Sequence, residues 1–325
     1  MSVPLPSDLA QKRLIVVVGK GGTGRTTLSA ALALLLAERG RNVLLYQANS
    51  KEKLSGLMGG PPVGQAIVRL HDKLWAVNPN PTDTIHEYGL MILRYETIYR
   101  MVFENRVSKA LVRAIPGIDD YALLGKMWFH TTEEIGGRWT YDTIVFDAPA
   151  TGHASTMLRI PRAILDAVPE GPLTRDALKV KALLEDPVRT GTLMCTLAEE
   201  MPTNETIELA ERLDKEMNIR PSAVVVNQLY PRRFGDGTPA GRALDALSVE
   251  ADADLAPLVL RARLSRDRRA LNDFYLERLR RELALPMTEL PILFRPTLGP
   301  AELEQLVRIL DRALARPGAR EQAAS

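Results

Sequence analysis

Nine residues near the amino terminus, GKGGTGRTT at positions 19–27, have the types and spacing of a phosphate-binding loop. Four glycines in this stretch allow the backbone to curl, so that successive N–H groups converge on an anion. Thr26 stands where the hydroxyl of such a loop ligands Mg²⁺ between the β- and γ-phosphates. One position departs from the G-x-x-x-x-G-K-[ST] pattern, because Arg25 replaces the lysine. The stretch predicts an ATP and Mg²⁺ site with an altered phosphate contact.

The first candidate site is therefore this loop. The predicted nucleotide-binding residues are Gly19, Lys20, Gly21, Gly22, Thr23, Gly24, Arg25, Thr26 and Thr27. A further candidate is Asp147, which ends the apolar run in YDTIVFDAP and would support the water shell of the metal ion. Thr26 and Asp147 are the two predicted metal-side residues.

Short apolar, β-branched runs alternate with helical patterns along most of the chain. The runs are RLIVVVG, NVLLYQ, YDTIVFDAP, TGTLMCTL, PSAVVVNQL and ELPILF. Fully apolar strands separated by helices are typical of a parallel sheet that is covered on both faces. We therefore predict an α/β protein with a parallel-sheet P-loop NTPase fold.

At 325 residues, the chain is expected to form one domain over 1–325. Between 81 and 137 the pattern becomes helical, with apolar residues such as Met91 and Tyr95 at helical spacing, which predicts a helical insertion in the sheet. A second helical stretch is expected over 239–285, and a flexible tail over 316–325.

Composition limits the possible partners and compartments. The net charge of +2 gives no reason to expect nucleic acid as a partner. The single cysteine, Cys195, excludes a disulfide or a cysteine-pair zinc site within one chain, suits a reducing compartment, and is expected to pack in the core. The start of the chain lacks the apolar region of a signal peptide, and no apolar run approaches the ~20 residues that span a bilayer. A cytoplasmic protein is the resulting expectation.

Two motifs carry a specific resemblance. The loop GKGGTGRTT resembles the deviant Walker A motif K-G-G-x-G-K-[ST]-[ST], and DAPATGHASTMLRIP at 147–161 resembles a switch II segment, D-[TA]-[AP]-x-T-G-H. Both are typical of the ArsA-like family, which contains the arsenite-pump ATPase and the ATPase that delivers tail-anchored membrane proteins. The segments PGIDDYALLGKMW and EEMPTNETIELAERL further resemble a bacterial subgroup that is often encoded as pairs.

This resemblance implies roles for several residues. Lys20 matches the signature lysine, which in the family reaches across a dimer interface to the partner's nucleotide. Asn227, in AVVVNQLYP, matches the asparagine that contacts the adenine ring, and its amide can both donate and accept hydrogen bonds. His153 falls inside switch II and is interpreted as a switch-positioning residue. A homodimer, or a heterodimer with a paralogous ATPase, is expected.

Two positions depart from the family pattern. Arg25 keeps the positive charge but presents a planar fork in place of a compact ammonium group. In NVLLYQANSKEKLSG, Asn49 replaces the family's aspartate that positions or deprotonates the attacking water. Because an amide cannot accept that proton, hydrolysis should slow by roughly 10²- to 10⁴-fold. Alternatively Asn49 is only a loop residue and another acid serves, with Glu52 the nearest. Lys20, Arg25, Asn49 and Asp147 are the catalytic candidates.

Three functions remain open. The first is an ATP-driven switch that handles a protein client or membrane partner through the helical insertion. The second is a subunit that binds nucleotide without turnover and completes the site of an active paralogue. A partition-type positioning ATPase is disfavoured by the switch II motif. Arsenic transport and a zinc-clipped dimer are disfavoured because the cysteines that they need are absent.

Two other features have less specific interpretations. Met91, Met101 and Met127 could line a client groove, but packing in the core is favoured. The basic run at 261–283 is interpreted as a solvated helix face in preference to a surface for nucleic acid or anionic lipid.

Overall fold

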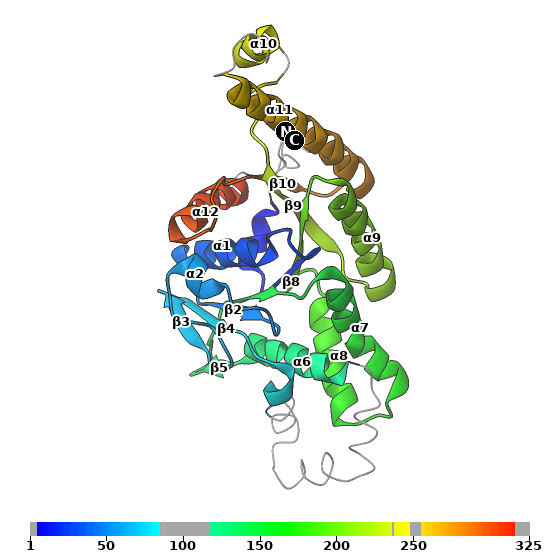
Figure 1. Cartoon of the computed structure of the whole chain (residues 1–325). Helices are drawn as coiled ribbons and strands as arrows, with labels where there is room; N and C mark the ends of the chain where they lie inside the picture. The colour runs from blue at the N-terminus through cyan, green and yellow to red at the C-terminus, as the bar shows by residue number, and fades with distance from the viewer. Residues whose placement is uncertain (1–4, 85–86, 88–116, 236, 248–254, 316–325) are drawn as a thin grey trace, which may run out of the picture.

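The computed structural model describes residues 5–84, 87, 117–235, 237–247 and 255–315. Its centre is an eight-stranded sheet with the strand order β10-β9-β8-β1-β7-β2-β4-β3 (Figure 1). Every pairing in this sheet is parallel except that of β3 with β4. The predicted α/β parallel sheet is therefore confirmed.

The sheet strands are short, and the inner ones coincide with the apolar runs. They are β1 (Leu14–Val18), β2 (Val43–Gln47), β3 (Val68–His71), β4 (Leu74–Val77), β7 (Thr143–Asp147), β8 (Thr190–Leu197), β9 (Pro221–Leu229) and β10 (Met287–Pro291). All five side chains of β1, β2 and β7 are buried. Such strands need helices on both faces, because neither face can be exposed to water.

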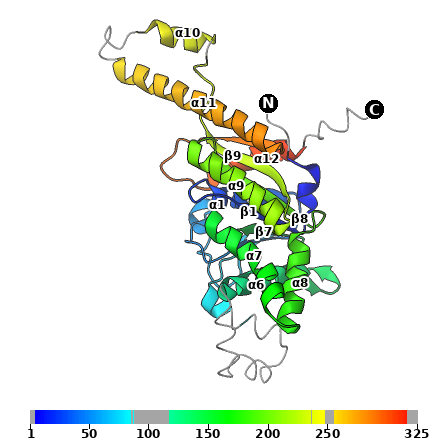
Figure 2. The ribbon, with the colours of Figure 1, turned by 90° about the vertical axis from the view of Figure 1, so that its right-hand side faces the viewer.

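Helices cover both faces of the sheet, as Figures 1 and 2 show. One face packs against the 3-10 helix η1 (Ser7–Gln11), α1 (Arg25–Glu38), α2 (Leu54–Met58) and α12 (Pro300–Ala315). The other packs against α6 (Ile118–Thr132), α7 (Thr151–Ala167), α8 (Pro172–Leu184), α9 (Glu200–Met217) and the end of α11 (Ala256–Leu283). Alternate residues of β1 enter the two apolar clusters, so the loop after β1 emerges between the layers.

The structure departs from the sequence prediction in three segments. The strands β3 and β4 were not predicted. Within the expected insertion, α6 is helical, and the short strands β5 (Glu134–Ile135) and β6 (Arg138–Trp139) that follow it form an antiparallel hairpin. The second helical stretch is two helices, α10 (Pro239–Ala246) and α11. Most of the insertion, with Met91 and Met101, lies outside the described residues, as does the tail at 316–325, whereas Met127 is buried in the core as favoured.

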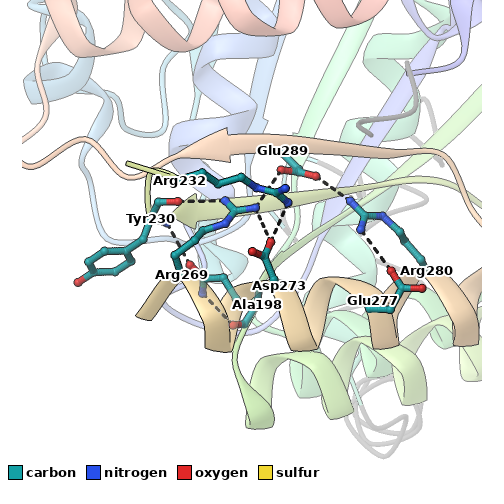
Figure 3. Close-up of polar contacts among 9 residues, drawn as sticks. Ala198, Tyr230, Arg232, Arg269, Asp273, Glu277, Arg280 and Glu289 are labelled. Atoms are coloured by element: carbon teal, nitrogen blue, oxygen red, sulfur yellow. Dashed lines mark hydrogen bonds and ion pairs between the residues drawn. The ribbon is translucent and has the colours of Figure 1, made fainter. Parts of the chain in front are cut away.

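The helices α10 and α11 form an arm that extends from the sheet (Figures 1 and 2). The carboxyl-terminal half of α11 is fixed to the body by polar contacts, drawn in Figure 3. Arg269 is 8% exposed, donates to the carbonyl of Tyr230 at 3.0 Å and pairs with Asp273 at 2.6 Å. Arg280 pairs with Glu289 of β10 at 2.7 Å. The interpretation of the basic run as a solvated face is therefore wrong for Arg269, which is buried, whereas Arg280 is paired but still partly exposed.

None of the helices in the described part of the chain is both long and apolar enough to cross a bilayer.

Candidate functional site

The phosphate loop connects the central strand to a buried helix. Strand β1 ends at Val18, and α1 begins at Arg25 with Gly24 as its left-handed N-cap at φ 94°. A Cβ atom on Gly19 would lie 2.1 Å from the carbonyl oxygen of Cys195, and one on Gly24 would lie 2.2 Å from Nδ2 of Asn227. Both positions therefore require glycine, for contact as well as for backbone conformation. The loop presents a helix N-terminus, which suits an anion.

The metal-side candidates are in direct contact. The hydroxyl of Thr26 donates to Oδ2 of Asp147 at 2.7 Å, and Nε2 of Gln47 donates to the same oxygen at 2.9 Å. Burial raises the pKa of Asp147, while the hydrogen bonds from Gln47 and Thr26, the charge of Arg25 and the nearby hydroxyl of Ser29 act in the opposite direction. Asp147 is 2% exposed. The sequence analysis did not identify Gln47.

These residues fit a hydrated magnesium ion. The other carboxylate oxygen of Asp147, Oδ1, is buried and has no hydrogen-bond partner in the part of the chain that the structure describes. A buried acceptor of this kind is costly unless a donor such as metal-bound water reaches it. Hydroxyl and carboxylate oxygens are also the ligands that Mg²⁺ prefers.

Arg25 points toward switch II. Its Nη1 atom donates to the carbonyl oxygens of Ala148 and Pro149, the latter at 2.6 Å. The backbone N–H of Thr151 in turn donates to the carbonyl of Gly19 at 3.1 Å. The guanidinium thus ties the start of α1 to the segment that follows Asp147. A lysine ammonium is a more compact donor and lacks the planar fork of a guanidinium.

Lys20 is held within its own chain. Its Nζ atom lies 2.5 Å from Oε1 of Glu205 on α9. Glu205 lies in the segment NETIELAERL, whose resemblance to the family was noted without assigning this residue a role. The sequence offered no spacing signal for the pair, which is 185 residues apart.

Asn227 lies against the loop at the end of β9. Its Nδ2 donates to the carbonyl of Thr23 at 2.9 Å, and its Oδ1 accepts from the backbone N–H of Gln228. Cys195 is fully buried, as expected for a core residue, and its thiol contacts the same carbonyl of Thr23. Burial raises the pKa of this thiol to about 12, so it stays protonated near neutral pH.

Asn49 is an exposed residue just after β2. Its backbone is left-handed, with φ 48°, and its N–H donates to the carbonyl of Pro79 at 3.0 Å. Glu52, the alternative acid, accepts from the backbone N–H of Ser55 at 2.8 Å and from its hydroxyl at 2.7 Å. Burial is the largest single effect and raises the pKa of Glu52, but the hydrogen bonds from Ser55, together with those from the backbone of Val63 and Leu54, lower the pKa overall. Glu52 therefore acts as a cap at the start of α2.

His153 links switch II to the region of the insertion. Its Nε2 lies 2.7 Å from Oδ2 of Asp120 on α6.

The other histidines of the described chain have separate surroundings: His130 is buried on α6, and His71 is exposed on β3. No group of three or more His, Cys, Asp or Glu side chains among the described residues could hold a metal ion by itself.

A parallel sheet whose central strand leads through a glycine-rich loop into a helix, beside a Thr26–Asp147 pair, defines a P-loop nucleotide-binding protein. Residues 12–170 match the family model described as anion-transporting ATPase. ATPase BagA of Mycobacterium tuberculosis is 31% identical over 284 residues, which cover 79% of this chain and 81% of that protein. The chain belongs to the ArsA-like ATPase family.

Other relatives agree with this assignment. ATPase GET3 of Mycosarcoma maydis is 27% identical over 267 residues, covering 70% of this chain and 77% of that protein. A Halobacterium salinarum protein named for driving an arsenical pump is 26% identical over 250 residues, covering 70% of this chain and 37% of that protein. The chain is thus similar to nucleotide-binding ATPases over most of its length.

Proposed function

We propose that this chain is a nucleotide-dependent switch that binds Mg·ATP at residues 19–27 and acts as a dimer on a protein client or membrane partner. The observation that carries the proposal is the 2.7 Å contact between Thr26 and Asp147 at the end of the phosphate loop. The catalytic and binding roles predicted for the loop, Asn49, Asp147 and Asn227 are part of the proposal. The single buried cysteine suits a cytoplasmic location.

The metal side of the site would be held by Thr26 and Asp147. When bound, Mg²⁺ supplies positive charge to the β- and γ-phosphate oxygens. Asp147 can accept through its free Oδ1 because both observed donors use Oδ2. The converging loop N–H groups and the α1 N-terminus would bind the phosphate charge.

Hydrolysis is proposed to be slow. Asn49 can orient a water molecule through its amide but cannot accept a proton from it. Arg25 directs Nη1 to the switch II carbonyls of Ala148 and Pro149, so its charge is partly engaged outside the loop. Glu52 is not well placed as a substitute, because both of its oxygens accept hydrogen bonds from Ser55, one from the backbone N–H and one from the hydroxyl.

The dimer is proposed on the role of Lys20. To reach a partner's nucleotide, this side chain must leave Glu205, which is one third exposed and lies in the same chain. The partner is a second copy or a paralogous ATPase. The single domain over 1–325, with its insertion near 81–137, would bind the client, and His153 with Asp120 would connect switch II to that region.

A second candidate function is a subunit that binds nucleotide without turnover and pairs with an active paralogue. The Arg25 contacts with switch II favour it, because they restrain the segment that must respond to the γ-phosphate. Both candidates require nucleotide binding and differ only in turnover.

Calorimetry with a non-hydrolysable ATP analogue, with Mg²⁺ and with excess chelator, tests the common part of both proposals. Binding that depends on Mg²⁺ is expected, and no binding by the unmodified chain would refute both. Single-turnover phosphate release then separates them: slow turnover by the chain alone supports the switch. Turnover only after addition of a paralogue with an intact lysine and aspartate supports the non-hydrolysing subunit.

A further inference from the structure

Gln47 is a polar residue in an otherwise apolar strand. It ends β2 and is paired in register with Asp147, the last residue of the neighbouring strand β7. Parallel strands in register place the two side chains on the same face of the sheet, which here is the face that α1 and Thr26 cover. Gln47 is 0% exposed. Its amide is therefore isolated from solvent and close to the metal side of the site.

The hydrogen bonds around Asp147 are distributed unevenly between its two oxygens. Oδ2 accepts from both Nε2 of Gln47 at 2.9 Å and the hydroxyl of Thr26 at 2.7 Å. Oδ1 of Asp147 and Oε1 of Gln47 have no hydrogen-bond partner within bonding distance in the described chain. The buried hydroxyl of Ser29 lies close enough to lower the pKa of Asp147, but it makes no hydrogen bond of normal geometry. Two buried acceptor oxygens from adjacent strands therefore lack donors. Such acceptors are rare in proteins and each requires an explanation.

We propose that Gln47 is a positioning residue for the metal side of the nucleotide site. Its amide nitrogen fixes the carboxylate of Asp147 through Oδ2, which leaves Oδ1 to accept from metal-bound water. Its own carbonyl oxygen, Oε1, is a second acceptor for that water shell. This inference rests on the proposed binding of Mg·nucleotide.

A purely structural role would use only the amide nitrogen of Gln47 and not its carbonyl oxygen. Only the amide nitrogen is needed to satisfy Oδ2, and Thr26 already donates to that oxygen. A buried glutamine whose carbonyl has no partner is a net cost unless something donates to it. A hydrated divalent cation supplies several O–H donors at once, which accounts for both free oxygens.

Two substitutions at this position have opposite expected effects. In Gln47→Leu, the fixed carboxylate and the second acceptor are both lost, so the metal should strengthen nucleotide binding less. Gln47→Glu also loses the amide donor, but it places two carboxylates against each other beside the metal's water shell. Because Mg²⁺ offsets their repulsion, the metal should strengthen binding more. A merely structural glutamine would make both substitutions act on stability and neither on metal dependence. Thr288→Val is the matched control, because Thr288 is buried on β10 with a hydroxyl that also lacks a partner.

The experiment is calorimetry of the full chain with a non-hydrolysable ATP analogue at about pH 8, which favours ionisation of two adjacent carboxylates although their repulsion raises the pKa of one of them. The quantity compared is the ratio of Kd in excess chelator to Kd in excess Mg²⁺. We expect Gln47→Leu to reduce this ratio about tenfold, in the range of residues that orient metal ligands, with the chelator Kd unchanged. We expect Gln47→Glu to increase the ratio and Thr288→Val to preserve it.

The outcomes are distinguishable. If the unmodified chain binds no nucleotide, the proposed function fails and this inference fails with it. If it binds with Mg²⁺ dependence, but the two Gln47 variants leave the ratio unchanged or shift it in the same direction, only this inference is overturned. Thermal melting identifies a variant that does not fold. If Gln47→Leu is that variant, Gln47→Glu decides alone, and a ratio that does not increase overturns the inference.

Discussion

Nζ of Lys20 and Oε1 of Glu205 lie 2.5 Å apart within one chain. Each side chain is 32% exposed, so water screens the ion pair, which is expected to contribute about 0.2–1 kcal/mol. An attraction of that size holds the lysine beside α9 but can be exchanged for a contact with a partner's phosphates. The ion pair therefore favours the state in which Lys20 contacts Glu205 over the state in which Lys20 is free to contact a partner subunit, but only by a small free energy.

Glu205→Gln should favour nucleotide-dependent dimerisation. Removal of the carboxylate frees Lys20, so the concentration of protein at which a non-hydrolysable analogue induces a dimer should fall roughly 1.4- to 5-fold for each ion pair removed, the equivalent of the free energy above. Lys20→Ala should abolish the induced dimer. Sedimentation velocity measures both. Glu208→Gln is the control, since Glu208 pairs with Arg212 on the same helix. A Lys20→Ala chain that dimerises normally would show that the lysine acts within its own chain.

Restoring the family residues should accelerate hydrolysis. Arg25→Lys returns a compact ammonium to the loop and releases the contacts to the carbonyls of Ala148 and Pro149. Asn49→Asp returns a carboxylate that can accept a proton. We expect the double variant to raise kcat about 10²-fold, and each single change to do less. Phosphate release is the measurement, and an unmodified chain as fast as the double variant would contradict the prediction.

Gly24→Ala should weaken binding of the Mg·ATP analogue at least about tenfold. The new Cβ would approach Nδ2 of Asn227 to 2.2 Å, and an L-residue at φ 94° costs about 1–2 kcal/mol. Gly22→Ala separates these effects, because Gly22 has a similar φ of 88° but open space around a Cβ. Calorimetry should show a smaller loss of affinity for the Mg·ATP analogue in Gly22→Ala than in Gly24→Ala. Equal losses would mean that backbone strain alone matters and that contact with Asn227 does not.

His130 should make the fold sensitive to acid. Burial lowers the pKa of this histidine, although its 2.9 Å contact with Glu133 raises it in part. A histidine in the unfolded chain has a pKa near about 6.5 and binds a proton more readily than the buried ring. Keeping the ring neutral therefore costs no free energy above about pH 6.5. As the pH falls from there toward the lowered pKa of the folded state, the free energy of unfolding decreases.

Denaturant unfolding at several pH values measures this effect. The free energy of unfolding should fall by up to about 1.4 kcal/mol per pH unit below about pH 6.5 through this one group. His130→Phe keeps an aromatic ring among Tyr46 and Tyr141 and should flatten that dependence. The exposed His71 supplies the control His71→Phe. An unchanged slope in His130→Phe would assign the acid sensitivity to other groups.

The centre of the fold could be predicted from the sequence because its signal is local. The runs TGTLMCTL and PSAVVVNQL coincide with β8 and β9, since strands buried on both faces must be apolar throughout. The strands β3 and β4 were missed for the converse reason. β3 lies at the edge of the sheet and alternates half-buried with exposed residues over only four positions, too few to establish a period. β4 lies beside it and is mostly buried, but its apolar run is also only four residues long.

In the candidate site too, residues in local motifs could be predicted from the sequence, whereas residues brought in by long-range contacts could not. The loop and Asp147 form contiguous motifs, so their positions were readable from spacing. Gln47, Glu205 and Asp120 enter through contacts across 100, 185 and 33 residues, and no local pattern distinguishes them from other polar residues. Arg25 was correctly identified as unusual, but its orientation toward switch II depends on how β7 is placed beside β1.

The arm formed by α10 and α11 also divides the chain into regions of unequal local stability. In the eight residues of α10, only Gly241 and Leu244 are buried, whereas every residue of β1 is buried between two helical layers. Amide hydrogens of α10 should therefore exchange with solvent deuterium through a local opening that leaves the sheet intact, and those of β1 only through global unfolding. Nucleotide binding to the loop would slow exchange in β1 and leave α10 unchanged. The exchange rate of α10 thus provides an internal reference within the same molecule.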